Sequence, residues 1–399
     1  MEILIAILYC FHQVFGNIPF GSKILNSNLD FFYILGVIGV IFVIFKRKED
    51  ISRLILYSFP IVVYGIFQCL IFNNLNSSKL IVNIFKITIC ISLMILVSRK
   101  SSDFKIEKFV DYVCRFYIIF TPIAFILSSN TYFWRLNDTV NKYNTIRLNL
   151  FYIEPSELGF HLSIIIIILI YLIIKEKVIK IRVKYLVYMM DCFILLSLAK
   201  AYGSSVILLA SIMIISFGII LAKMKYKNIL VGYGLIFLFS LVIIFSVVTK
   251  SSMYMRTVDT LNGTDSSNRY RVGVTQAFTS TALNSTNGIG IGLGNLNTDE
   301  TKNIFKSTGM TDVVAASFPY FIAEGGIFAA LYIVMLMLLI LKKVIVSKNM
   351  MISILFLFLF LYQIYGGYFT NPVNWILYGL ILRWDTEITP QNQILLDKR

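Results

Sequence analysis

Runs of apolar residues follow one another along almost the whole chain, and they constrain its fold more than any other feature. One of them, within residues 159–174, contains IIIIILIYLII without a charge. Twelve such runs can be placed, near residues 2–17, 31–45, 54–73, 79–97, 109–128, 159–174, 185–200, 205–222, 229–249, 315–341, 351–368 and 372–384. A helix needs about 20 apolar residues to cross a bilayer. The sequence therefore predicts an all-α polytopic integral membrane protein with about 12 transmembrane helices.

The composition agrees with a membrane protein. Hydrophobic residues make up 58% of the 399 residues and charged residues only 14%, whereas about 25% of a soluble domain is charged. The net charge of +15 would suggest a nucleic-acid partner for a soluble protein. In a membrane protein it is better explained by Lys and Arg in cytoplasmic loops, so no nucleic acid is expected. We expect residues 1–399 to form a single transmembrane bundle.

The basic residues also predict an orientation. Lys and Arg concentrate in short connections on one side of the apolar runs: 46–53, 99–108, 175–184, 223–227, 342–348 and the tail 383–399. By the positive-inside rule both termini are then cytoplasmic. The opposite, outer side has two long connections, 129–158 and 250–314. Loops longer than about 12–15 residues are usually functional or disordered, so we expect any chemistry outside, where ATP and nucleotide sugars are absent.

The first long loop ends in a charged stretch, RLNLFYIEPSELGFHLS, at the start of an apolar run. It carries four ionisable side chains: Arg147, Glu154, Glu157 and His161. Glu157 and His161 are four positions apart and therefore share one helical face. This grouping favours a site for an anionic, lipid-linked ligand at the membrane surface. An ordinary helix start is an equally open interpretation, because Ser156 can cap the helix and Glu157 suits its positive end.

The second long loop contains two arginines, Arg269 and Arg271, in SSNRYRVGVTQAF. Arginine suits phosphate because its planar guanidinium binds two oxygens at once. Further along, four glycines alternate in NGIGIGLGN: Gly288, Gly290, Gly292 and Gly294. Alternating glycines let backbone N–H groups converge into an anion-binding nest, although a flexible turn with two solvated arginines stays open. No βαβ pattern surrounds these glycines, which argues against a nucleotide fold.

Single charges in or beside the apolar runs are further candidates. Glu324 lies in FPYFIAEGGIFAALYIV, and intramembrane carboxylates are costly and usually functional. Lys200, at an outer span end, can contact a phosphate or simply extend its ammonium to the interface. Arg115 and Asp191 lie deeper, and we predict that they pair with each other. The five cysteines have no CxxC spacing and the outer loops hold no metal-ligand cluster, so no metal and no cofactor is expected.

Four elements occur in a fixed order in this chain. Arg147 precedes the Glu154-Pro155-Ser156 motif, Arg271 lies six residues before Ala277, a GxGxG segment follows, and Glu324-Gly325-Gly326 lies in an apolar run. This order, over about residues 147–335, resembles the O-antigen polymerases (Wzy class) of the O-antigen polymerase/ligase superfamily. The resemblance implies a glycosyltransferase of the Gram-negative inner membrane with its active face in the periplasm. Such an enzyme transfers the growing polysaccharide to the non-reducing end of a new lipid-linked repeat unit.

The resemblance also implies roles and partners. It assigns the pyrophosphate to Arg147, Arg269 and Arg271, and the role of base or sugar-positioning group to Glu154, with Glu157 and His161 as second choices. Substrate binding would further involve Gly290, Gly292, Gly294, Lys200 and Glu324. Arginines can stabilise a diphosphate leaving group without a metal, and a carboxylate can accept the proton of the attacking hydroxyl. The implied partners are an undecaprenyl-pyrophosphate-linked oligosaccharide, membrane lipid and, as a further candidate, a chain-length regulator.

Two alternatives stay open. An O-antigen ligase would carry a His-Asn-type motif about nine residues before the acid, but Ala315 stands at the ungapped position and no histidine follows His161. A lipid-linked oligosaccharide flippase or other transporter would also have about twelve spans. For a transporter we expect charges along a path through the membrane, whereas the charges here gather in the two long outer loops.

Overall fold

The computed structural model divides the chain into two compact units, each described by itself. The first unit comprises Met1–Asn17, Asp103–Arg269 and Ser353–Tyr362; the second comprises Ile18–Ser102, Tyr270–Ile352 and Gln363–Arg399. The structure describes residues 2–11, 47–99, 104–128, 130, 133–135, 146–152, 154–221, 255, 258–259, 262–264, 273–296, 298, 316–347 and 349–383. The single bundle expected for residues 1–399 stays a prediction.

Helices dominate both units, as the predicted all-α class requires. A helix is found in every predicted apolar run except 31–45 and 229–249, which lie outside the described residues. Within the described part, five helices are long and apolar enough to cross a membrane: α4 (Lys48–Ile71), α5 (Ser77–Ser98), α6 (Ile106–Ile126), α7 (Pro155–Lys175) and α15 (Ser317–Ser347). The total of twelve spans and their orientation stay predictions.

The outer faces of these helices are apolar. Leu70 on α4 is 78% exposed, Ile126 on α6 is 81% exposed and Met335 on α15 is 73% exposed. Soluble proteins rarely leave large contiguous apolar surfaces in water. Lipid chains cover such surfaces without cost, so these helices indicate a membrane-embedded protein.

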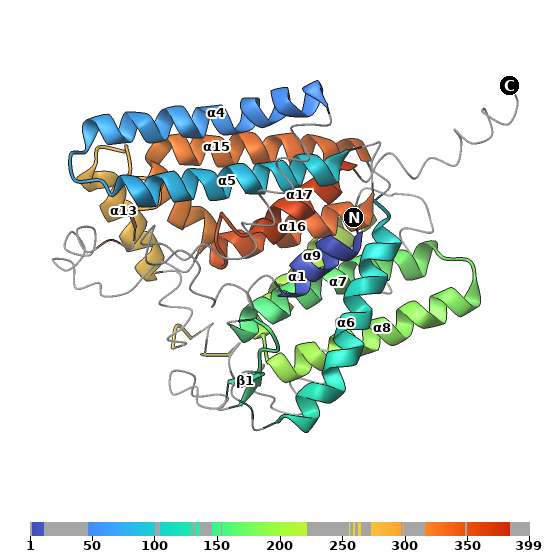
Figure 1. Ribbon diagram of the computed structural model, residues 1–399. Helices are drawn as coiled ribbons and strands as arrows, with labels where there is room; N and C mark the ends of the chain where they lie inside the picture. The colour runs from blue at the N-terminus through green and yellow to red at the C-terminus, as the bar shows by residue number, and fades with distance from the viewer. Residues whose placement is uncertain are drawn as a thin grey trace, which may run out of the picture. The chain divides into compact units, whose positions relative to one another are not determined.

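The first unit is built around a helical hairpin. Its elements are α1 (Glu2–Phe11), α6, β1 (Trp134–Arg135), β2 (Arg147–Leu148), α7, α8 (Ile179–Ala199), α9 (Tyr202–Leu221) and residues 353–362 of α16 (Met350–Tyr365). A short turn at residues 176–178 joins α7 to α8, and the two helices pack together (Figure 1). Because they run in opposite directions, the start of α7 and the end of α8 lie at the same end of the hairpin. Strand β2 contacts α8 there.

Buried aromatic side chains fill the core of the first unit. Tyr9 lies edge-on to Phe109, with ring centroids 5.5 Å apart, and also edge-on to His161, at 4.8 Å. The Tyr117 and Tyr152 hydroxyls are 3.1 Å apart, and the Tyr152 hydroxyl donates to the Tyr9 carbonyl at 3.2 Å. These contacts hold α1, α6 and the start of α7 together, and they place a histidine inside the core.

The second unit contains long helices that lie side by side. Its elements are α4, α5, α13 (Thr275–Ser285), α15, α17 (Pro372–Arg383) and the remaining residues of α16. In Figure 1, α4, α15 and α5 run alongside one another, and α17 packs on α5 and α15. Tyr64 on α4 stacks on Phe328 of α15, with ring centroids 4.1 Å apart. At the α4–α5 turn, the Asn76 side chain accepts the Lys79 N–H at 3.1 Å and so caps α5.

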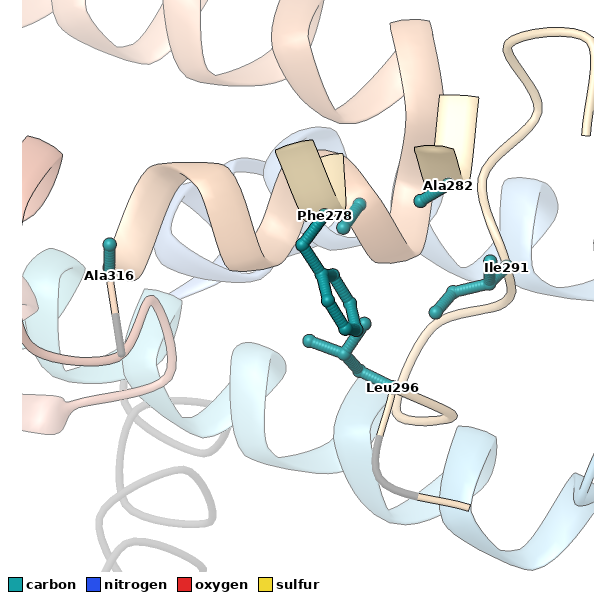
Figure 2. Packing of buried hydrophobic residues seen from close by; sticks show 6 residues of the cluster. Phe278, Ala282, Ile291, Leu296 and Ala316 are labelled. Carbon is teal, nitrogen blue, oxygen red and sulfur yellow. The ribbon is translucent and has the colours of Figure 1, made fainter. Parts of the chain in front are cut away.

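A small apolar cluster joins α13 to the segment that follows it and to the start of α15. Its buried members are Phe278, Ala282, Ile291, Leu296, Ala316 and Ala323. Figure 2 shows the ring of Phe278 directed from α13 toward Leu296, with Ile291 nearby. The cluster fixes α13 and the glycine-rich residues that follow it against α15, although both lie in the predicted loop 250–314.

The predicted pair between Arg115 and Asp191 is wrong. Arg115 binds Asp111, one turn earlier on α6, at 2.8 Å, and Asp111 also accepts from Lys184 at 2.9 Å and from the Tyr188 hydroxyl at 2.8 Å. Asp191 accepts instead from the Thr121 hydroxyl at 3.0 Å. The physical reason is proximity, because residues four apart on a helix are always neighbours, whereas a contact between helices depends on their packing.

Candidate functional site

Two arginines lie opposite each other in the short β1–β2 pair of the first unit. The strands are antiparallel, with Trp134 opposite Leu148 and Arg135 opposite Arg147. The Trp134 indole N–H fixes β1 by donating to the Ala124 carbonyl at the end of α6, at 2.9 Å. Directly opposed residues project from the same face, and like charges there destabilise the pair. An anion bound on this face would offset that repulsion.

Arg147 is almost fully buried, and its guanidinium binds the end of α8. Its Nε donates to the Ala199 carbonyl at 3.2 Å and its Nη2 to the Lys200 carbonyl at 3.4 Å. Lys200 ends the helix in the left-handed conformation, with φ 48°, as residues after a helix often do. The last carbonyls of a helix lack partners within it and carry partial negative charge. Arg147 is therefore a cap for α8 as well as a candidate ligand residue.

Glu154 stands at the start of α7 and pairs with Arg135. It is the N-cap residue, and Pro155 follows at the first helical position, where a missing N–H has no consequence. The side chain makes no capping bond; its Oε2 lies 2.6 Å from Nη1 of Arg135. The prediction that Ser156 caps the helix is wrong, because Ser156 already lies inside it. We call Arg135, Arg147, Glu154 and Lys200 the arginine–glutamate site.

His161 lies within the first-unit core and is fully buried. Its Nδ1 is 2.8 Å from the Glu157 carbonyl oxygen, which confirms that the two residues are one turn apart. Its ring stacks on Tyr152 with centroids 4.6 Å apart, and its own carbonyl accepts from the Tyr9 hydroxyl at 2.7 Å. Burial raises the pKa of Tyr152 well above its ordinary value, so this hydroxyl keeps its proton at neutral pH. A role of His161 or Glu157 as the base stays a prediction.

The second unit brings the predicted glycines together with Glu324. Residues 288–294, here the glycine segment, have positive φ at Gly288, Gly290, Gly292 and Gly294. Helix α15 is broken at Gly326, with φ 61° and ψ −147°. The segment fits this break: Ile291 N–H donates to the Ala323 carbonyl and Gly292 N–H to the Glu324 carbonyl, each at 3.0 Å. In return Ile327 N–H donates to the Gly288 carbonyl at 2.9 Å.

The carboxylate of Glu324 is buried and already hydrogen-bonded. It accepts from the Asn83 amide at 3.0 Å and from the Leu296 N–H at 3.3 Å, and the Gly294 backbone and Tyr320 hydroxyl also contact it. Backbone N–H groups of the glycine segment and of Leu296 therefore converge on a hydrogen-bond acceptor, as in a nest, and this acceptor is the Glu324 carboxyl group of the chain itself. Substrate binding by the glycines and Glu324 stays a prediction.

Three polar residues that the sequence reasoning did not single out contribute to these sites. Gln68 is fully buried; its amide donates to the Ile289 and Glu324 carbonyls and its oxygen accepts from Leu293 N–H, all at 3.0 Å. Asn83 binds Glu324, and Arg135 binds Glu154. The signal for Gln68 and Asn83 was a polar side chain inside an apolar run. The signal for Arg135 was an arginine in the same predicted loop as Arg147.

The predicted residues thus fall into two groups. In the first unit Arg147 binds the Lys200 carbonyl, and Glu154 is linked to Arg147 through Arg135, which lies opposite Arg147 in the strand pair. In the second unit Gly290, Gly292 and Gly294 lie against Glu324, while Arg269 and Arg271 lie outside the described residues. Among the described residues, the Arg135 and Glu154 side chains are 36% and 47% exposed, whereas Arg147 and Glu324 are buried. Comparisons with protein-family models, curated proteins and solved structures found no match to the chain.

Proposed function

We propose that the chain is an O-antigen polymerase of the Gram-negative inner membrane, acting on undecaprenyl-pyrophosphate-linked repeat units at the periplasmic face. The observation that carries this proposal is the arginine–glutamate site. Two arginines are directly opposed there, beside a carboxylate at the start of the apolar helix α7. A lipid diphosphate has the matching shape, because its lipid chain lies along apolar helices while its anionic group stays at their ends.

The residues of this site suit the chemical step. The bond between the anomeric carbon of the donor chain and its diphosphate breaks, and the diphosphate leaves with the electron pair. The hydroxyl at the non-reducing end of the acceptor unit forms the new bond to that carbon and gives its proton to Glu154. Arg135 and Arg147 stabilise the charge of the leaving diphosphate by charge-assisted hydrogen bonds. The carboxylate supplies general-base catalysis, which typically contributes a factor of about 10²–10⁴.

The position of the site within the first unit supports the same function. Glu154 and Lys200 lie at one end of the α7–α8 hairpin. The turn at its other end is rich in basic residues: Lys175, Lys177, Lys180, Arg182 and Lys184. Cytoplasmic connections carry such clusters, so the arginine–glutamate site belongs on the periplasmic side in our proposal.

Deletion of the gene tests the proposal directly. We expect the lipopolysaccharide of the deletion strain to carry a single repeat unit on lipid A–core, and a plasmid copy to restore the ladder of chain lengths on a gel. Arg135→Ala should insert in the membrane and fail to restore the ladder. A deletion strain that still makes the full ladder would overturn the proposed function.

The break in α15 favours a second candidate, a lipid-linked oligosaccharide transporter. Transporters often build their binding sites at interrupted helices, and Gly326 interrupts an apolar helix next to the buried carboxylate of Glu324. In the described residues this break is filled by the glycine segment and Gln68. Repeat units that accumulate on the cytoplasmic face in the deletion strain would support the transporter; accumulation on the periplasmic face supports the polymerase.

A further inference from the structure

We propose that the Arg135–Glu154 ion pair is a latch, in which Glu154 occupies the position of a substrate phosphate until that phosphate arrives. This inference rests on the proposed function, because it concerns how a diphosphate reaches the arginines. In this pair Nη1 of Arg135 lies 2.6 Å from Oε2 of Glu154. Both side chains are partly exposed. A dissolved or lipid-borne anion can therefore reach them.

The two opposed arginines differ in how freely they can change partner. Arg147 is 7% exposed and binds the Ala199 and Lys200 carbonyls, so its guanidinium stays where α8 ends. Arg135 is held at its backbone by the strand pair, while its side chain binds an exposed carboxylate. Exchange of the anion on Arg135 therefore requires no change in the helices.

A diphosphate is the stronger partner for this guanidinium. It carries more charge than one carboxylate and offers oxygens in the geometry that a guanidinium binds with two parallel bonds. It also relieves the repulsion between the opposed arginines better than a monovalent group does. We therefore expect a diphosphate to displace Glu154 from Arg135.

Displacement would place a free carboxylate next to the reacting group. The backbone of Glu154 is set by the start of α7, with Pro155 fixing the first helical residue. Only the Glu154 side chain then moves when its partner leaves. The carboxylate becomes available to accept the hydroxyl proton only after the diphosphate is bound, so the latch couples donor binding to the presence of the base.

The test measures binding of inorganic pyrophosphate to the purified full-length protein in detergent, by titration calorimetry. Glu154→Gln removes the competing charge, and we expect it to bind pyrophosphate about 2- to 5-fold tighter, the range of an exposed ion pair. Arg135→Ala should bind at least about 10-fold more weakly. Glu157→Gln removes the same charge one turn along α7 and controls for a general change in electrostatic potential. Its increase in pyrophosphate affinity should be less than half the increase of Glu154→Gln.

The outcomes separate the latch from the function. Tighter pyrophosphate binding by Glu154→Gln, together with loss of the polymer ladder in cells, supports both. Equal or weaker binding by Glu154→Gln, with Glu154→Ala behaving alike and both variants eluting as the wild type does on gel filtration, overturns the latch. Equal gains in Glu154→Gln and Glu157→Gln overturn it too. A full ladder in the deletion strain overturns the polymerase. The pyrophosphate titrations then still decide whether an anion displaces Glu154 from Arg135.

Discussion

At the scale of single residues, Arg147 contributes to stability whatever its role toward a ligand. Its guanidinium binds two carbonyls at the end of α8, where a cation also interacts favourably with the helix dipole. Arg135 contributes little to stability, because it pairs with an exposed carboxylate. A loss of activity in an Arg147 variant is therefore informative only when folding is measured alongside it.

We expect Arg147→Ala to lower the free energy of unfolding by about 1–3 kcal/mol, because two carbonyls at the end of α8 lose a charged donor. The stability of Arg147→Lys should lie between those of the wild type and Arg147→Ala, because one ammonium group cannot bind both carbonyls as the planar guanidinium does. Arg135→Ala is the matched control and should change stability by less than about 1 kcal/mol. Thermal unfolding in detergent measures all three; an Arg147→Ala midpoint equal to the wild type would contradict the capping role.

At the scale of elements, the break in α15 and the glycine segment stabilise each other. The break leaves N–H and C=O groups of α15 without helical partners, and unpaired backbone groups are costly in an apolar environment. The glycine segment supplies those partners, and Gln68 supplies more from α4. The close approach requires a residue without Cβ, because a Cβ at Gly290 would lie 2.5 Å from the Glu324 carbonyl oxygen.

Gly290→Ala should therefore destabilise the protein by about 2–4 kcal/mol, through overlap with backbone atoms and a positive φ of 82°. Gly203→Ala on α9 is the control, because a Cβ there would meet nothing within 4 Å. Because Gly203 lies in the first turn of α9, alanine there should change the free energy of unfolding by less than about 0.5 kcal/mol. Thermal unfolding and expression level measure both. Equal unfolding midpoints for the two variants would mean that the segment is not packed into the break.

At the scale of the whole molecule, each unit offers its own test of orientation. In the second unit the α4–α5 turn lies near the glycine segment, since Asn76 N–H donates to the Asn295 side chain at 2.9 Å. In the first unit the α7–α8 turn lies at the opposite end from Glu154. The distribution of basic residues predicts that the α4–α5 turn faces the periplasm and the α7–α8 turn faces the cytoplasm.

Cysteines introduced into the two turns should report these sides. In a variant whose five cysteines are replaced, we expect a membrane-impermeant maleimide to label Asn74→Cys in intact cells. It should label Val178→Cys, where the native side chain is 53% exposed, only after the inner membrane is opened. Labelling of both positions from the same side, or in the reverse order, would contradict the predicted topology.

The position of the helices and the membrane-protein class could be predicted from the sequence alone. Long apolar runs become helices because only a helix satisfies every backbone hydrogen bond within its own segment in lipid, and every described apolar run contains one. The sequence also predicted that a helix begins near Ser156 and Glu157, and α7 begins at Pro155. The predicted cap at Ser156 was wrong by two residues. The helix begins at Pro155, whereas a cap at Ser156 would start it at Glu157.

The contacts between distant residues could not be predicted from the sequence. Asn83 binds Glu324 across 241 positions of sequence, and Arg147 binds the end of a helix about 50 positions later. Asp191 was the wrong partner for Arg115 because that prediction also required knowing how two helices pack. Charge, polarity and glycine spacing show that a residue needs a partner, because a buried charge or an unpaired backbone group is costly. The choice of that partner depends on how helices pack, and this information is absent from any single stretch of the chain.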